Sequence, residues 1–183
     1  GALGDDLLGW AQFPGGPASS DGIVIATRSL PTIGTYPYNL GRTAVHEVGH
    51  YLSLYHIWGD GGCSVDDLVS DTPVAGDPNF GCPTEAQDSC PNHADPDMWE
   101  NYMDYTYDQC MTMFTKDQRA RMIDSLENTR TGIRTKEACP TCQDPIVTTT
   151  VAPTTTTAGP TTTTPVPPLF SITGFTACME VGD

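Results

Sequence analysis

Three histidines and one glutamate lie within one short segment and could hold a catalytic metal ion. Residues four apart share one face of a helix, so His46 and His50 could bind a single ion together. Glu47 directly follows the first of these ligands, where its carboxylate could act as general base toward a water. His56 reaches the same ion only if the chain turns sharply after Leu52. Three neutral imidazoles and one open position form the ligand set of a catalytic zinc ion.

The alternative interpretation is a helix that carries unrelated surface or core histidines. A second motif, Asn101-Tyr102-Met103-Asp104-Tyr105, argues against it. A tight turn with a Met below three histidine ligands is the second signature of the metzincin peptidases, and the chain resembles that clan at both motifs.

The closer resemblance is to the pappalysin-type (cytophagalysin, M43-like) family of metzincins. It rests on GRTAVHEVGHYLSLYHIWGD at Gly41–Asp60, SDTP at Ser70–Pro73, and the segment Asn101–Met122. The segments Leu7–Gly16 and Asp21–Leu30 look like the strands that precede the zinc helix in that family. The similarity extends over roughly residues 3–130.

The resemblance implies a secreted zinc endopeptidase that hydrolyses peptide bonds in protein or peptide substrates. Zinc would be held by His46, His50 and His56, with Glu47 as general base. Tyr105 matches the position at which metzincin relatives place a tyrosine near the metal, and its phenol could there hydrogen-bond the oxyanion. Met103 would form an apolar floor below the ligands. The expected fold is α+β: an N-terminally incomplete metzincin-like domain with a twisted sheet, a zinc-binding helix and an irregular, disulfide-stapled C-terminal subdomain.

The chain departs from the clan at Ser53, where a Gly usually stands. A residue other than Gly in the left-handed conformation costs on the order of 1–2 kcal/mol. Ser53 could offset part of this strain by a local hydrogen bond to the backbone. The strain predicts that Ser53→Gly tightens zinc binding.

The net charge of −15 argues against nucleic acid and anionic membranes as partners. The acidic residues concentrate between Arg42 and Lys116, a stretch without Lys or Arg. This stretch is either a solvated acidic loop or a loop that binds calcium, which prefers several oxygen ligands. Some relatives carry calcium after the zinc helix, and the candidate ligands here are Asp67, the Ser70 carbonyl, Asp71 and Thr72.

Cysteine usage indicates an extracellular protein. Four cysteines in the loop-rich stretch allow three disulfide connectivities or, as an alternative, a four-thiolate zinc site. The resemblance implies the pairs Cys63–Cys90 and Cys82–Cys110. Cys139-Pro-Thr-Cys142 has the CxxC spacing of redox motifs, but beside a Thr/Pro-rich tract we expect a structural disulfide at the domain edge. Cys178 is the third remaining cysteine, and the odd total of seven predicts that one partner lies outside this sequence.

Composition divides the chain into three parts. Residues 1–138 read as the catalytic domain, residues 139–168 as a Cys/Thr/Pro-rich, mucin-like linker, and residues 169–183 as the start of a further module. No apolar run approaches the about 20 residues that a membrane span requires. The chain begins with Gly, so we expect any secretory leader to lie outside it.

The elements that position the motifs can be predicted from the pattern. We expect strands at Ile23–Thr27 and, more weakly, Leu7–Phe13. A first helix should span about Gly41–Leu52, with Asn39 as its cap. Its apolar face would comprise Ala44, Val45, Val48 and Leu52. A second helix should start at Thr115 with a capping box to Gln118 and end at Thr131-Gly132.

Two other functions remain open from the sequence. The first is a catalytically inactive metzincin-like binding module on a mucin-like stalk, which the Ser53 departure and the incomplete N-terminal part favour. The second is a matrix protein whose acidic loops bind calcium, which explains the charge but not the histidine spacing.

Overall fold

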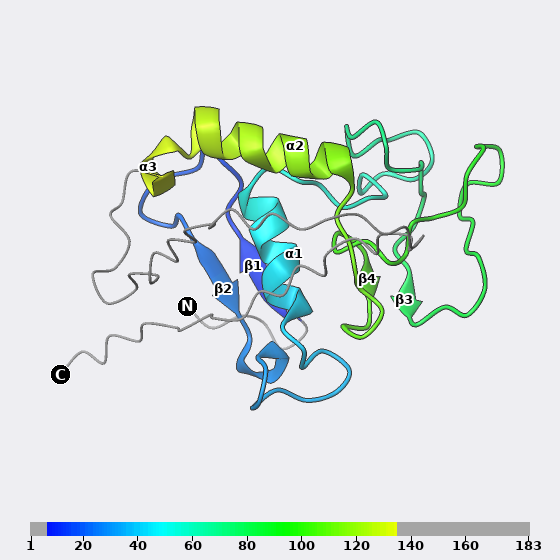
Figure 1. Ribbon diagram of the computed structural model, residues 1–183, viewed down its shortest axis with the longest axis horizontal. Helices are drawn as coiled ribbons and strands as arrows, with labels where there is room; N and C mark the ends of the chain where they lie inside the picture. Colours follow the sequence, from blue (N-terminus) through cyan, green and yellow to red (C-terminus); the bar gives the residue numbers. More distant parts are fainter. Residues whose placement is uncertain (1–6, 135–183) are drawn as a thin grey trace, which may run out of the picture. The chain divides into compact units, whose positions relative to one another are not determined.

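The computed structural model describes residues 7–134. Two short β-ribbons and two main helices organise this part of the chain (Figure 1). In chain order the elements are β1 (Gly9–Ala11), β2 (Ile23–Ile25), a 3₁₀ turn (Thr27–Ser29), α1 (Arg42–Tyr51), β3 (Phe80–Gly81), β4 (Tyr105–Thr106), α2 (Lys116–Asp124), a π-helical turn (Ser125–Thr129) and α3 (Thr131–Arg134). The linker predicted at 139–168, the module start at 169–183, and Cys139, Cys142 and Cys178 lie outside the described residues.

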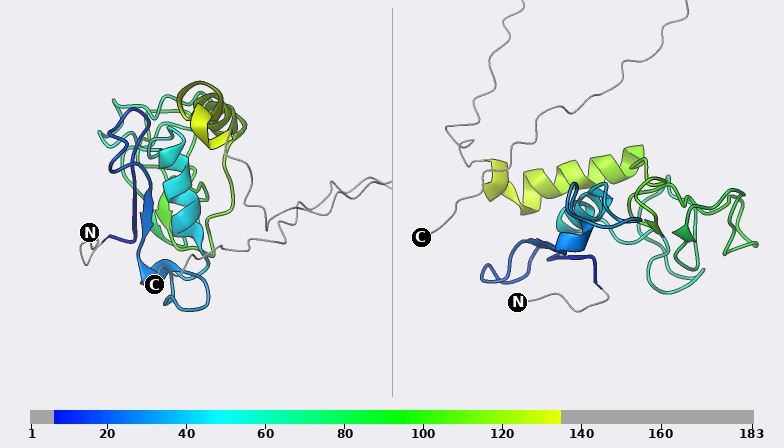
Figure 2. Two further views of the ribbon diagram at one scale, coloured as in Figure 1. Left: turned by 90° about the vertical axis from the view of Figure 1, so that its left-hand side faces the viewer. Right: turned by 90° about the horizontal axis from the view of Figure 1, so that it is seen from below.

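β1 and β2 form an antiparallel ribbon in which Trp10 lies opposite Val24. Both strands are shorter than the sequence pattern predicts, but each falls within its predicted segment. α1 lies against this ribbon, and α2 crosses near the C-terminal end of α1 on the side away from it (Figures 1 and 2). The helix that carries the first two histidines therefore packs on the ribbon and meets the region of α2 only near its C-terminal end.

The N-terminus of α1 is capped from a distant part of the chain. The prediction of Asn39 as its cap was wrong: the cap position is Gly41, in the left-handed conformation at φ 81°, and no local side chain caps the helix. Instead, Oδ2 of Asp108 accepts hydrogen bonds from the amides of Leu40, at 2.7 Å, and Arg42, at 3.2 Å. A carboxylate at this end satisfies free N–H groups and complements the helix dipole.

The buried face of α1 differs from the predicted apolar one. Its buried residues are Thr43, His46, Glu47, Gly49 and His50, whereas Val48 is 41% exposed. A hydropathy pattern assigns His and Glu to the solvent side of a helix, but here they face the interior. Burial of such polar side chains is costly without partners or a bound ion.

The chain turns after α1 at Ser53, which has the left-handed φ of 79° expected for that position. The amide of Leu54 then donates to the carbonyl of Gly49, at 2.9 Å. The predicted local hydrogen bond of Ser53 to the backbone is replaced by one to a distant side chain, since its hydroxyl donates to Oγ of Ser125. Nε of Arg121 also donates to the Ser53 carbonyl, at 2.8 Å. Contacts from α2 and the turn that follows it therefore stabilise this strained turn.

α2 starts as predicted, with Thr115 as cap and a reciprocal capping box to Gln118. Its end was predicted wrongly: the regular helix stops at Asp124, and a π-helical turn leads to α3. Gln118 is fully buried and also pairs with Asn101, each amide donating to the other at 2.8 and 3.1 Å. One side chain thus joins the start of α2 to the turn that carries Met103.

Arg130 connects three parts of the fold. It is 8% exposed and donates to the Tyr51 carbonyl, to the Gln12 carbonyl, and to both carboxylate oxygens of Asp21 at 2.7 and 3.0 Å. Its guanidinium also lies over the Tyr51 ring. This side chain therefore ties the β1–β2 ribbon to the C-terminal end of α1.

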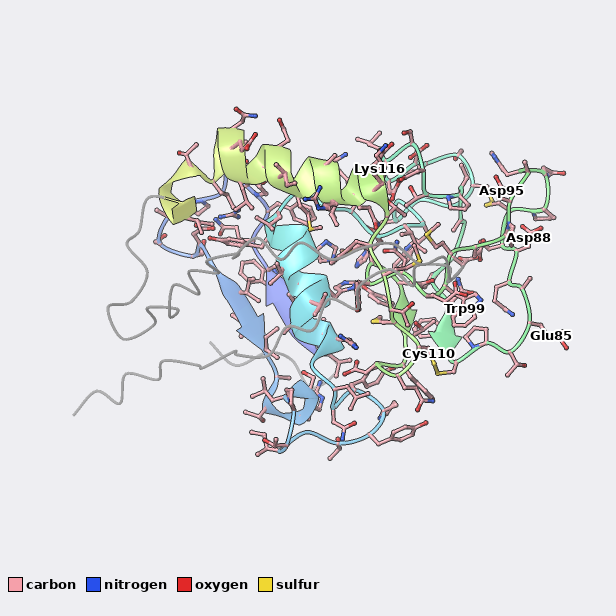
Figure 3. All side chains as sticks on the ribbon, viewed as in Figure 1. Glu85, Asp88, Asp95, Trp99, Cys110 and Lys116 are labelled. Atoms are coloured by element: carbon pink, nitrogen blue, oxygen red, sulfur yellow. A yellow bond between two sulfur atoms is a disulfide. The ribbon has the colours of Figure 1, made fainter. Side chains whose placement is uncertain are left out.

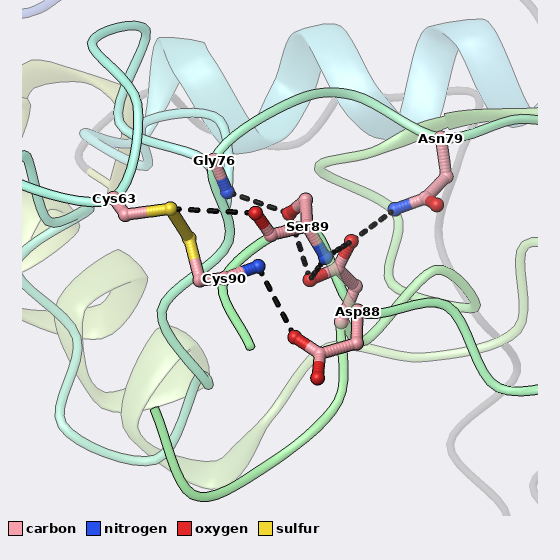
Figure 4. The surroundings of a disulfide bond; sticks show 7 residues. Cys63, Gly76, Asn79, Asp88, Ser89 and Cys90 are labelled. Carbon is pink, nitrogen blue, oxygen red and sulfur yellow. Dashed lines mark hydrogen bonds between the residues drawn. A yellow bond between two sulfur atoms is a disulfide. The ribbon is translucent and has the colours of Figure 1, made fainter. Parts of the chain in front are cut away.

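The long segment between α1 and α2 is irregular and is held by two disulfides, Cys63–Cys90 and Cys82–Cys110. Around the first disulfide, the Gly76 amide donates to the Ser89 hydroxyl, and the Cys90 amide to Asp88 (Figure 4). Leu54, Ile57, Trp58, Ala75 and Met103, all from this segment, form its buried apolar core. Glu85, Asp88 and Asp95 lie on its outer loops (Figure 3).

Candidate metal centre

The structure brings the three predicted histidine ligands together. His46 and His50 project from successive turns of α1, and the turn at Ser53 returns His56 to the same point. One ligand atom of each ring lies within 4.8 Å of the others. Nε2 of His50 and Nε2 of His56 are 3.1 Å apart.

The hydrogen bonds of the three rings define which nitrogen faces the centre. Nδ1 of His46 contacts the Tyr102 carbonyl at 2.7 Å, and Nδ1 of His50 contacts the Leu54 carbonyl at 2.8 Å. Nδ1 of His56 contacts the Asp60 carboxylate at 2.8 and 3.0 Å. All these partners are acceptors, so each neutral ring carries its proton on Nδ1 and directs the lone pair of Nε2 inward.

This arrangement fits a metal ion. Two Nε2 lone pairs 3.1 Å apart repel each other unless a cation lies between them. Tetrahedral zinc with Zn–N bonds of about 2.0–2.1 Å separates its ligand nitrogens by about 3.3 Å. Within residues 7–134, this triad is the only group of three or more His, Cys, Asp or Glu side chains that converges closely enough to hold an ion.

The electrostatics keep the rings neutral, as metal ligands must be. Burial, together with the charges of His50 and His56, lowers the pKa of His46 to about 3. Burial likewise lowers the pKa of His50 to about 4 and depresses that of His56. No proton therefore competes for the inward lone pairs near neutral pH.

Glu47 lies between α1 and β1 and is 7% exposed. Burial raises the pKa of its carboxyl to about 7. Gly9 provides the space for this side chain, since a Cβ atom at Gly9 would lie 2.5 Å from Oε1 of Glu47. The strand residue opposite the helix therefore determines where the carboxylate can sit.

Tyr105 lies at the edge of the same centre. Its hydroxyl is 3.1 Å from Nε2 of His56, and its ring packs edge-on against His56 and Trp58. Because Nε2 of His56 has no proton, the Tyr105 hydroxyl is the donor of this contact. Burial raises its pKa to about 12, so the phenol stays protonated and able to donate.

Met103 is fully buried below the ligands. Its amide donates to Oδ1 of Asn101, and its sulfur touches Gly49 of α1 so closely that a Cβ there would overlap it. Met103 is therefore a packing residue that sets the spacing between α1 and the turn at 101–105.

A cleft of about 1050 Å³ passes the three histidines and Glu47. Aromatic side chains form much of its wall. They come from β1 and the loop after it, from the loops before and after α1, and from β3 and β4: Trp10, Phe13, Tyr36, Tyr38, Tyr55, Phe80 and Tyr105. Phe13 stacks on Tyr55 and also contacts the His50 ring, with ring centroids 5.3 and 5.2 Å apart. The centre is thus open to an extended ligand through an apolar cleft.

The four residues proposed for calcium lie in one loop, but only two of them meet. Thr72 donates its hydroxyl to Oδ1 of Asp67 at 2.8 Å. Ser70 and Asp71 instead pair with Asp117 at the start of α2, through the Ser70 hydroxyl and the Asp71 carboxylate. Oδ2 of Asp67 is buried and has no hydrogen-bond partner among the described residues.

Three residues that contribute to the centre were missed by the sequence reasoning. Gly9 gives Glu47 its space, Asp108 caps α1, and Asp60 contacts His56. A local signal existed only for Asp60, an acidic residue four positions after a proposed ligand. The other two act across the fold, where spacing carries no information.

Comparison with known proteins identifies the class of this fold and site. The profile of the M43 peptidase family, described as "Pregnancy-associated plasma protein-A", matches residues 9–127. The chain therefore belongs to the M43, or pappalysin, family of metallopeptidases.

The similar proteins include several named as metalloproteases. An "Extracellular metalloprotease" of Arthroderma otae is 42% identical over 136 residues, which are 71% of this chain and 50% of that protein. Another of Pyricularia oryzae is 44% identical over 131 residues, 69% of this chain and 46% of that protein. Mature mirolysin of Tannerella forsythia, solved with a cleaved peptide, is 50% identical with a TM-score of 0.64, covering 72% of this chain and 52% of that one.

The chain spans about half the length of the relatives that it matches. Among residues 7–134, no helix has both the length and the apolar character needed to cross a membrane.

Proposed function

We propose that this chain carries the zinc centre and general base of an extracellular endopeptidase. The convergence of three inward Nε2 lone pairs, each fixed by an acceptor on Nδ1, is the observation that carries the proposal. Membership of the M43 family and relatives named extracellular metalloproteases support both the activity and the location. The cleaved peptide bound to mirolysin supports a peptide substrate.

His46, His50 and His56 would hold the zinc ion, which when bound acts as Lewis acid toward the scissile carbonyl and lowers the pKa of water. Glu47 accepts the proton of the attacking water and passes it to the leaving amine. Its raised pKa, about 7, suits both halves of this transfer. Tyr105, whose phenol stays protonated, donates a hydrogen bond to the oxyanion that develops on the substrate.

The test is peptide hydrolysis by the parent chain and by Glu47→Ala, with zinc content measured by elemental analysis. We expect one zinc per chain in both proteins and loss of hydrolysis only in the variant. Tyr105→Phe should lower kcat more than it changes KM, because its hydrogen bond forms with charge that develops in the transition state. Full activity of Glu47→Ala would refute its role as base. Zinc binding without hydrolysis by the parent would favour the binding module instead.

We also propose a calcium ion in the loop that follows the zinc helix. The supporting observation is Oδ2 of Asp67, a buried carboxylate oxygen without a partner among the described residues. Burial raises the pKa of Asp67 to about 6, as expected for a carboxylate whose negative charge no nearby cation stabilises. Oxygen ligands from Asp67 and Thr72 suit a hard cation, with the Ser70 carbonyl and Asp71 as further candidates. A melting temperature that does not rise with added calcium, in the parent as in Asp67→Asn, would refute this site.

A further inference from the structure

Asp60 differs from the partners of the other two histidines. His46 and His50 direct Nδ1 at neutral backbone carbonyls, whereas Nδ1 of His56 contacts both oxygens of the Asp60 carboxylate, at 2.8 and 3.0 Å. We infer that Asp60 is a positioning residue of the metal centre, holding His56 in its binding orientation and strengthening its bond to the ion. This inference rests on the proposed zinc site.

The backbone around Asp60 is bent so that its side chain returns to His56. The Gly59 amide donates to the His56 carbonyl at 2.9 Å, and two consecutive left-handed residues follow, Gly59 at φ 61° and Asp60 at φ 59°. Asp tolerates this conformation better than most residues, but the conformation still costs on the order of 1 kcal/mol. An unfavourable backbone conformation that directs a side chain at a metal ligand points to a role at that ligand.

The His56 ring needs a second restraint besides packing. Trp58, which is buried, stacks on His56 with ring centroids 4.2 Å apart and planes 5° from parallel. Stacking fixes the plane of the imidazole but still allows two orientations, which differ by a 180° flip about the Cβ–Cγ bond. The Asp60 carboxylate selects between them, because only one of the two points Nδ1–H at Asp60 and Nε2 at the other two histidines.

The carboxylate also changes the electronic character of the ligand. A histidine that donates its second N–H to an anion binds a metal more strongly, and loss of such a partner typically costs about 10–100-fold in metal affinity. A hydrogen bond to an ionised acceptor is roughly twice as strong as one to a neutral acceptor. A neutral acceptor at position 60 should therefore keep about half of the free energy, which corresponds to a loss of about 3–10-fold.

Two substitutions that suit the left-handed backbone separate the orientation of the His56 ring from the effect of the negative charge on its bond to the metal. Asp60→Gly removes the acceptor, and Asp60→Asn keeps a neutral acceptor. Asp95→Asn is the matched control, since it removes the same charge from an exposed outer loop. Zinc dissociation constants are measured by competition with a chromophoric chelator, and circular dichroism checks the folding of each metal-free protein.

We expect zinc affinity to fall about 10–100-fold in Asp60→Gly and about 3–10-fold in Asp60→Asn, with no change in Asp95→Asn. The visible absorption bands of the Co²⁺-loaded proteins, which report ligand geometry, should shift in Asp60→Gly and stay unchanged in Asp60→Asn. Parent-like affinity in Asp60→Gly, or equal losses in both variants, would overturn the inference. If Asp60→Gly does not fold, a loss in Asp60→Asn that is absent from Asp95→Asn supports it, and no loss overturns it.

The same titration separates this inference from the proposed function. A parent chain that binds no zinc overturns the proposed function. A parent that binds zinc while Asp60→Gly binds it equally well overturns only the role of Asp60.

Discussion

Gly9 controls the position of the proposed general base, and Gly9→Ala tests that control. A Cβ at this position would lie 2.5, 2.6 and 2.8 Å from Oε1, Cγ and Cδ of Glu47. Ordinary contacts between carbon atoms lie at about 3.5–4.0 Å, so the Glu47 side chain must move by on the order of 1 Å. Gly9 is an extended strand residue without a left-handed φ, so the backbone itself accepts Ala.

A displacement of this size has a large effect on catalysis and a small one on metal binding. Misplacement of a catalytic group by about 1 Å can lower the rate about 10²-fold, equivalent to about 2.7 kcal/mol of transition-state stabilisation. The histidine ligands make no contact that the new methyl group would break. We therefore expect kcat/KM for a peptide substrate to fall about 100-fold in Gly9→Ala while zinc content stays at the parent level.

Gly16→Ala is the matched control. A Cβ at Gly16 would overlap the Gln12 amide side chain as severely as one at Gly9 overlaps Glu47, but in the loop between β1 and β2. This variant should keep parent-like kcat/KM. Parent-like activity in Gly9→Ala, or an equal loss in Gly16→Ala, would refute the argument that strand β1 positions the base.

Three further predictions concern stability, measured by urea unfolding. Replacing Cys63 and Cys90 by Ser should lower the free energy of unfolding by about 3–4 kcal/mol, since the disulfide closes a loop with a sequence separation of 27; a loss under about 1 kcal/mol would contradict this. Arg130→Met should lower the free energy of unfolding by on the order of 3 kcal/mol, because it removes the hydrogen bonds that the buried Arg130 side chain donates. An unchanged unfolding midpoint would contradict the view that Arg130 ties the ribbon to α1. The Arg130 guanidinium lowers the pKa of Asp21 below 3.8, so this pair stabilises the folded state above that pH and less below it. Parent and Asp21→Asn should therefore differ at neutral pH and converge as the pH falls below 3.8 and through the lowered pKa of Asp21. A difference that is independent of pH would exclude the ion pair.

The convergence of the three histidines could be predicted from the sequence because its geometry is mostly local. The spacing of His46 and His50 follows from helical periodicity, and the turn needed for His56 was placed correctly at Ser53. The capping box of Thr115 with Gln118 is likewise local, and it was found. Each of these features depends on residues a few positions apart.

The features that could not be predicted depend on contacts between distant parts of the chain, or on polar side chains that are buried although hydropathy predicts their exposure. The carboxylate that caps α1 comes from Asp108, 66 residues after Arg42 at the start of the helix, whereas the sequence pattern offers only the local candidate Asn39. The buried side of α1 was misassigned because hydropathy treats His46 and Glu47 as solvent-facing. The early end of α2 coincides with a π-helical turn, at which Ser125 contacts the Ser53 turn, and no sequence pattern marks that turn.

The reciprocal amide pair of Asn101 and Gln118 has a consequence for cooperativity. Gln118 caps α2, while Asn101 holds the amide of Met103 below the histidines. The first turn of α2 and the turn below the histidines therefore do not open independently, because separating them breaks two hydrogen bonds between buried side-chain amides. Zinc binding should accordingly slow hydrogen–deuterium exchange in the first turn of α2. Exchange in this helix would then report, at a distance, whether zinc is bound at the three histidines.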